Sequence, residues 1–521
     1  MTEQNVYIQN EVKEAEQSGR QFSLLDSIFA WVCLIASYLF CRAFPVSDNS
    51  FGGCLLILGI FAATFAVFMV RGEKIGALPI IVAISAIVIC FALVVTSNTF
   101  LGSYAYFYAI LAYMYFVFSA TPNTTKKGFS DFIAVDFFKA IFIMPFASFG
   151  VVFKALFSGK AKGSGKAILK VLLGIAFAVI PTIIIFSLLS YDKDFTSLFK
   201  NIFDFKFLDV MSHFLSIGFA IPISMYVFGL YASSTEHKCK GVASEQGCRN
   251  FSNKIKIAPV ITVLAAVIPI LFIYVIFFIS QSKYYLSGFV GVLPDELSYA
   301  EYAREGFFQL CTVSCLNLAI ITAVSVFMKR AKGRRSLALK ILAIVFSLST
   351  LLLISTAIAK MVMYIDCYGL TQKRVYSTWL MGVLALIFIF IIIKQFVPKT
   401  RVIALSLSVL VVLFGALSLC NIDRIIAGYN VDRYIDGSLN EFDISASIEL
   451  GDAAIPELVR LNDELKVKVD DGTASYSQKG TYYKLSRELR NIKELRADEE
   501  KEVFSYTIPY IQASKALENV K

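Results

Sequence analysis

The chain has 521 residues, of which 57% are hydrophobic and only 17% are charged, and its net charge is +10. Because soluble domains usually carry about a quarter charged residues, this composition excludes a water-soluble globular protein. Lipid is expected to cover much of the apolar surface.

The N-terminal segment 1–23 contains four Glu, with Lys13 and Arg20. It lacks the basic start, the short apolar stretch and the small-residue exit of a cleaved signal peptide. We therefore expect residues 1–23 to be a cytoplasmic segment and the first apolar stretch to be a retained span.

Apolar stretches of about 20 residues, the length that crosses a bilayer as a helix, recur throughout 24–421. They predict an all-α fold, a polytopic transmembrane helical bundle of about 11 spans. The expected spans are 24–44, 51–70, 75–96, 101–120, 167–190, 211–232, 257–280, 305–328, 337–359, 375–393 and 402–421.

The distribution of Lys and Arg orients this map. With the N-terminus in the cytoplasm, the cytoplasmic loops carry 24 Lys and Arg and the outer loops carry 7. This imbalance follows the positive-inside rule. It predicts a multi-pass protein of the cell (plasma) membrane with an extracytoplasmic C-terminus. The net charge then reflects topology, so we expect membrane lipids and no nucleic acid as partners.

The cytoplasmic segment 121–166 is basic and holds a stretch, 131–157, that is too charged for a comfortable span. Lys139 and Lys154 flank an aromatic-rich middle with Pro145. Two interpretations are open: a helix lying on the anionic inner leaflet, or a piece packed back into the bundle.

Four prolines fall within the predicted spans: Pro79, Pro181, Pro222 and Pro269. Proline kinks a helix and frees a backbone carbonyl, and broken helices often line transporter sites. Membrane helices also simply tolerate proline. Three cysteines near the outer face could form disulfides, which spacing alone does not decide: Cys41, Cys367 and Cys420.

The tail, 422–521, is acidic, with a net charge of −5. Its apolar residues recur at near-helical intervals between Ile444 and Leu461, and Asn440 and Asp452 are plausible N-caps. We predict a small helical extracytoplasmic domain whose acidic surface contacts a protein partner.

Polar residues gather at the outer ends of the spans around 305–375. Glu301, Arg304 and Glu305 have i, i+3, i+4 spacing and share a helix face. Lys360 ends a span, and we predict that it pairs with Glu305 first or Glu301 second, because an unpaired charge there is costly. The candidate outer-leaflet polar cluster is Glu301, Arg304, Glu305, Asn317, Lys360, Asp366, Tyr368 and Arg374.

The simpler interpretation is that 364–376, YIDCYGLTQKRVY, is the turn of a helical hairpin. Its tyrosines would then be headgroup anchors, and Gly369 would permit the reversal.

Sequence signals for catalysis are scarce. The chain has two His, and His237, Cys239 and Cys248 match no closed four-ligand metal pattern. A phosphate-binding glycine loop and a nucleophile elbow are both missing. We expect no catalytic residues, no metal and no cofactor, and enzymatic activity is the weaker expectation.

Several strings resemble a bacterial membrane family known as domain of unknown function 4153, with the related 4173. They are SYAEYAREGFFQL (298–310), ISTAIAKMVMYIDCYGLTQKRVY (354–376), AGYNVDRYIDG and LGDAAIPELVRL (within 427–461). The resemblance covers roughly residues 170–460. It implies a polytopic bacterial membrane protein, and the family supplies no reaction.

Three functions follow from these observations. The first is a non-enzymatic envelope or signalling scaffold with the tail as a contact surface. The second is a transporter of a small or lipid-like solute along the proline-containing spans. The third and weakest is a membrane transferase on lipid-linked substrates, with Glu301 or Glu305 as general base.

Overall fold

The computed structural model describes residues 22–43, 51–126, 128–156, 206–239, 244–290, 299–329, 334–497 and 505–520, with a few isolated residues between 174 and 195. Within these residues the regular structure is helical, and one isolated bridge joins Ala258 to Met328. Ten of the described helices are long and apolar enough to cross a membrane. The predicted polytopic helical bundle is therefore confirmed. The expected span 167–190 lies almost entirely outside the described residues.

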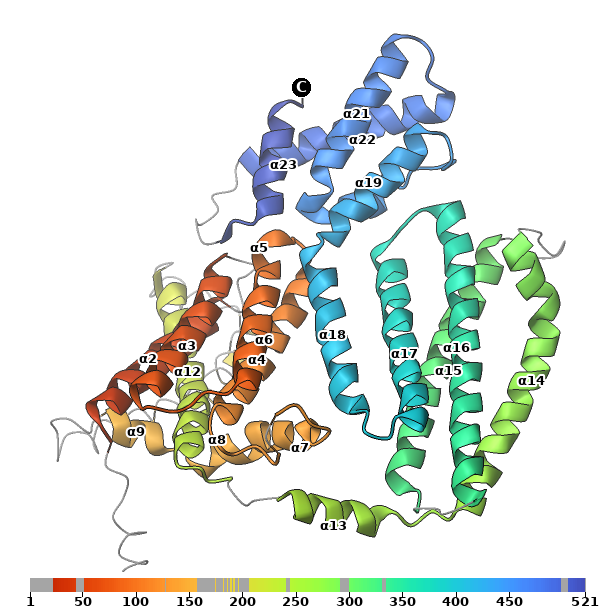
Figure 1. The fold of residues 1–521 in the computed structure, drawn as a ribbon. Coiled ribbons are helices and arrows are strands. Elements are labelled where there is room, and N and C mark those ends of the chain that lie inside the picture. The colour runs from red at the N-terminus through yellow and green to blue at the C-terminus, as the bar shows by residue number, and fades with distance from the viewer. Residues whose placement is uncertain are drawn as a thin grey trace, which may run out of the picture.

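The helices of the N-terminal half of the bundle lie together (Figure 1) and pack around one aromatic core. Phe29, Phe68, Phe116 and Tyr231 lie almost fully buried at its centre. Pro79 lies in the first turn of its helix rather than near the middle, whereas Pro222 lies inside a helix that continues through it. The helices of this half are α2 (Leu24–Ala43), α3 (Phe51–Val70), α4 (Ala77–Cys90), α5 (Ala92–Val95), α6 (Thr99–Ser119) and α12 (Lys206–Thr235).

The C-terminal half of the bundle has a separate core, in which Phe307, Phe346 and Phe388 are buried. Its helices are α14 (Val260–Val290), α15 (Tyr299–Phe327), α16 (Arg334–Tyr368) and α17 (Gln372–Phe396). Helix α18 (Val402–Leu419) lies between the halves (Figure 1) and packs on both α4 and α17. Helix α18 therefore contacts both halves of the bundle.

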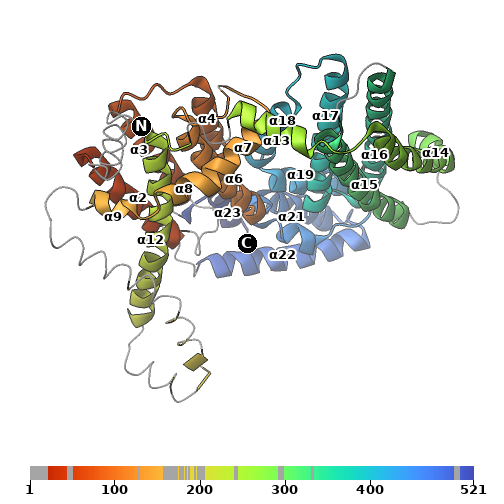
Figure 2. The ribbon, with the colours of Figure 1, turned by 90° about the horizontal axis from the view of Figure 1, so that it is seen from below.

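The segment 128–156 forms short pieces at one end of the N-terminal half: α7 (Ile133–Phe138), a π-helical turn (Lys139–Ile143), α8 (Met144–Ala147) and α9 (Val151–Leu156). Seen from that end (Figure 2), these pieces and α13 (Glu245–Ile255) cross the near face of the bundle. Lys139 and Asp136 are buried 3.7 Å apart, whereas Phe138, Phe142 and Phe146 are exposed. One face of the segment therefore packs into the bundle and the other is apolar and uncovered.

The C-terminal tail is a helical domain with its own core, at the end of the bundle opposite α13 (Figure 1). Its helices are α19 (Ile422–Ile435), α20 (Ile444–Ile448), α21 (Ile455–Asp470), α22 (Tyr476–Ala497) and α23 (Ile508–Glu518). The N-cap of α20 is Asp443, which accepts a hydrogen bond from Ala446 N at 2.9 Å. The expectation that Asn440 and Asp452 cap helices was wrong. Asp452 instead forms an ion pair with Arg496 of α22, which fastens α22 to the start of α21.

Candidate functional site

A buried polar contact joins the C-terminal domain to both halves of the bundle. We call Asn98, Gln372, Tyr376 and Asp423 the polar joint. Asp423, in the first turn of α19, is 1% exposed. Its carboxylate accepts hydrogen bonds from Asn98 Nδ2 at 2.9 and 3.1 Å and from Gln372 Nε2 at 2.8 Å. Asn98 precedes α6 and Gln372 begins α17, so three separate parts of the chain meet at one carboxylate.

The orientation of the Asn98 amide is fixed by the helix that it caps. Its Oδ1 accepts a hydrogen bond from Leu101 N at 3.0 Å, which satisfies one free N–H at the start of α6. Its Nδ2 must then face outward, where it donates to Asp423 and also to Tyr376 Oη at 2.8 Å. Helix capping and the contact with α19 therefore depend on the same side chain.

A second contact, the turn clamp, consists of Gly369, Leu370, Asn430 and Arg433. Asn430 Oδ1 accepts from Leu370 N at 2.7 Å, and its Nδ2 donates to Leu370 O at 2.9 Å. Arg433 donates to the carbonyls of Ile365 and Asp366, which end α16. Gly369 adopts φ +73°, a left-handed conformation that favours glycine. Asn430 and Arg433 of α19 therefore hold the end of α16 and the turn that follows it by hydrogen bonds to backbone groups.

A polar groove of about 1050 Å³ lies between this turn and the start of the C-terminal domain. Its walls come from residues 366–374 on one side and 438–450 on the other, with Asn430 at the junction. Both signs of charge line it, from Asp366, Lys373, Arg374, Glu441, Asp443 and Glu449. Such a surface suits a polar, hydrogen-bonding partner better than a lipid chain.

Three predicted site residues gather at this groove. Arg374 lies 4.1 Å from the ring centroid of Tyr364 and donates to Tyr368 O at 2.9 Å and to Gly369 O, so it caps the end of α16. The Asp366 carboxylate lies 3.8 Å from Arg433 Nη1. Tyr368 is half exposed and packs against Tyr364. The hairpin turn is therefore real, and it is also bound by the tail.

Two further predicted residues, Asn317 and Lys360, lie elsewhere. Asn317 is fully buried inside the C-terminal half, where it accepts from Tyr274 at 2.5 Å and donates to Thr350 at 3.0 Å. Lys360 is 8% exposed, and its Nζ lies so close to Gly306 of α15 that a Cβ there would collide with it. Glu301, Arg304 and Glu305 belong to α15, but their side chains lie outside the described residues. The structure therefore leaves the predicted pairing of Lys360 untested.

Sequence reasoning missed Asn98, Gln372, Tyr376, Asp423, Asn430 and Arg433. One signal was available. Asp423 and Asn430 are seven residues apart, so they share a helix face directly after the last span. A polar face at that place indicates a helix that docks on the membrane-embedded part.

The fold and the joint define a class: a multi-pass membrane protein whose helical C-terminal domain is docked on its own bundle. Residues 83–461 match the family model described as a domain of unknown function, DUF4153. The chain belongs to this family, as the sequence motifs indicated, and the match begins earlier than residue 170. It includes the whole polar joint and the turn clamp. Neither a curated protein nor a solved structure matches the chain.

The buried carboxylate predicts a pH dependence of docking. Burial raises the pKa of Asp423 above its ordinary value, and the hydrogen bonds from Gln372 and Asn98 only partly oppose this. The docked state therefore binds a proton more tightly than the undocked state. The contribution of Asp423 to stability falls as pH rises from its ordinary pKa, near 3.8, through the raised one.

We expect hydrogen exchange of the α19 amides to be slower near pH 5 than near pH 8, after correction for intrinsic rates. Asp423→Asn should reduce this difference. An equal pH dependence in both proteins would show that Asp423 does not titrate in this range.

Proposed function

We propose that this protein is a non-enzymatic scaffold of the cell envelope, and that the polar groove is its contact site for a protein partner. The observation that carries the proposal is the docking of α19, which fixes one wall of the groove against the other through Asp423 and Asn430. A preorganised polar groove binds a peptide segment without a large ordering cost. The mixed charges favour a partner with polar side chains and free backbone groups.

The test uses a photo-crosslinking amino acid placed in the chain in living cells. Glu441 and Glu449 line the groove and are exposed. Asp471, at the end of α21, is exposed and does not line it. We expect one crosslinked protein adduct at both groove positions, none at Asp471, and loss of the adduct when Asn430→Ala opens the turn clamp. Adducts that form equally at Asp471, or that survive Asn430→Ala, would contradict the proposal.

We further propose that the protein lies in the plasma membrane with its N-terminus in the cytoplasm and its C-terminal domain outside. The loop charges support this orientation, and the basic segment 244–256 lies at the end of the bundle opposite the C-terminal domain (Figure 1).

In a background without exposed native cysteines, Ser438→Cys is expected to react with an impermeant maleimide in whole cells. The control, Gln246→Cys on α13, is expected to react only after lysis. The reverse pattern would invert the topology.

Transport of a lipid-like solute is a second candidate, favoured by one observation. An apolar cavity adjoins Pro222, which lies inside α12. Transport would require protein-dependent exchange of a labelled lipid between the leaflets of reconstituted vesicles. No described contact favours the transferase hypothesis.

A further inference from the structure

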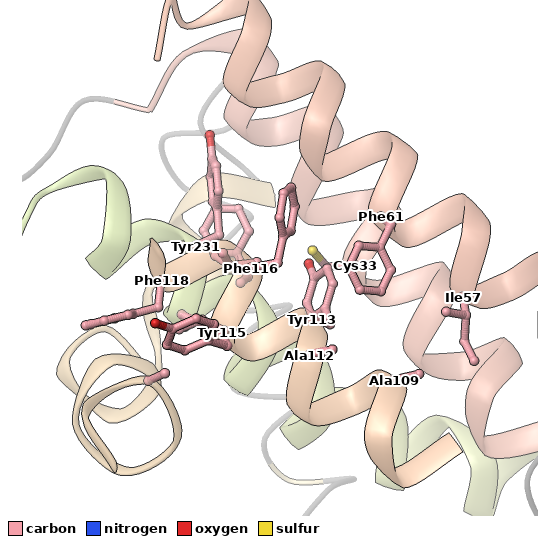
Figure 3. Packing of buried hydrophobic residues seen from close by; sticks show 14 of the residues in the cluster. Cys33, Ile57, Phe61, Ala109, Ala112, Tyr113, Tyr115, Phe116, Phe118 and Tyr231 are labelled. Atoms are coloured by element: carbon pink, nitrogen blue, oxygen red, sulfur yellow. The ribbon is translucent and has the colours of Figure 1, made fainter. Parts of the chain in front are cut away.

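The N-terminal half of the bundle contains a partly open apolar cavity of about 500 Å³, lined by residues of α2, α3, α6 and α12 and by Phe146 and Phe149 near α8. Figure 3 shows Cys33, Phe61, Tyr113 and Ala109 converging from three helices. This volume is within the range of sites that hold small molecules, roughly 300–1,000 Å³. It is too large to be an ordinary packing defect.

Two tyrosines of the wall, Tyr113 and Tyr226, direct their hydroxyl groups to partners outside the cavity. Tyr113 Oη lies 2.9 Å from Thr64 Oγ1, and Tyr226 Oη donates to Ile141 O at 2.8 Å. Their rings remain to line the space. Because a buried water needs two to four polar partners, the cavity does not suit water. An empty space of this size would forfeit the dispersion contacts of every side chain around it.

The cavity also reaches the outer surface of the bundle. Phe146 lines it, yet is 58% exposed. The ring of Phe146 stacks on Phe149 at 5.5 Å and meets Tyr226 edge-on at 5.8 Å. The helices α2, α3, α6 and α12 are all long and apolar enough to span the membrane. Because these helices are expected to span the bilayer, we expect the opening between them to face lipid.

We propose that this cavity binds one hydrocarbon chain of a membrane lipid, which enters beside Phe146. The lining recognises an alkyl chain by shape and lack of polarity, so the headgroup contributes little to selection. The site is independent of the scaffold proposal. It would also hold if the second candidate, transport, failed, because a chain can stay bound without crossing the bilayer.

The experiment reconstitutes the full chain in vesicles of phosphatidylcholine that carries a diazirine in the middle of one acyl chain. After illumination, labelled positions are mapped by peptide mass spectrometry. We expect labels on Ala109, Tyr113 and their neighbours, which are nearly buried. Replacing the labelled lipid with its phosphatidylglycerol analogue is expected to give the same map.

Two variants fill the cavity from different helices, and each has a control on its own helix. Ala36→Trp and Ile110→Trp change residues of the lining. Leu39→Trp and Phe107→Trp change residues that are 47% and 59% exposed and do not line it. Labels inside the cavity are expected to be lost in the two cavity-filling variants and kept in the two control variants.

Wild-type labelling restricted to the exposed faces of the helices would overturn the proposal without any variant. So would cavity labels that persist in Ala36→Trp and Ile110→Trp when both proteins keep the wild-type elution profile. A map that appears with one headgroup only would replace the alkyl-chain site with a headgroup site.

Discussion

Replacing Gly369 with alanine is expected to lower the free energy of unfolding of the C-terminal domain by about 3 kcal/mol. The left-handed backbone at φ +73° disfavours a Cβ. That Cβ would also collide with Asn430 Oδ1. The two hydrogen bonds between Asn430 and Leu370 would then be lost or strained. Thermal unfolding of the purified protein and hydrogen exchange of α19 measure the effect.

A matched control separates backbone strain from loss of the clamp. Gly472 has φ +70° and open space around its Cβ position, so Gly472→Ala should cost only about 1 kcal/mol. In an Asn430→Ala background the collision disappears, and Gly369→Ala should then cost about as much as Gly472→Ala. If the effects of Gly369→Ala and Asn430→Ala on the free energy of unfolding are fully additive, the Cβ at position 369 does not act by displacing Asn430.

Replacing Lys360 with alanine is expected to destabilise the bundle by about 3–5 kcal/mol if its acidic partner is left unpaired in the bundle. Lys360 is 8% exposed and its Nζ lies beside Gly306 of α15. This burial argues against snorkelling to water, and Glu305 on the same helix is the predicted partner. Thermal unfolding of Lys360→Ala, Glu305→Gln and the double variant forms the required cycle.

The double variant is expected to recover much of the loss, because it removes both charges. Lys340→Ala is the control: it lies on the same helix, α16, but is exposed, so its effect should stay within about 0.5 kcal/mol. Additivity of Lys360→Ala and Glu305→Gln within about 0.5 kcal/mol would exclude the pair and leave Lys360 as a packing residue.

The spans could be predicted because each is specified locally, by about 20 apolar residues in a row. The residues at which the helices end could not be predicted in the same way. The prediction ended one span at residue 359, but α16 continues to Tyr368, and the turn is confined to the few residues before Gln372. Polar residues at a membrane surface can continue a helix, so the loss of apolar residues does not mark where the helix ends.

The polar joint was beyond sequence reasoning for a different reason. Asn98 and Asp423 are separated by 325 positions, and no pattern in the sequence indicates that they are in contact. Asn317, a member of the predicted polar cluster, illustrates a related limit. Asn317 lies three turns below Glu305 on α15 and found local partners on α14 and α16. Spacing along one helix fixes a shared face, but not which neighbour that face meets.

Helix α18 has a mechanical consequence. It packs into the N-terminal core through Leu407 and Val411, and the carbonyl of its Leu413 accepts a hydrogen bond from Trp379 of α17 at 3.1 Å. Only Cys420 and Asn421 connect it to α19. So short a linker leaves little slack, and we expect a displacement of α19 to move α18 with it. Tension on the C-terminal domain would then reach the seam between the two halves of the bundle.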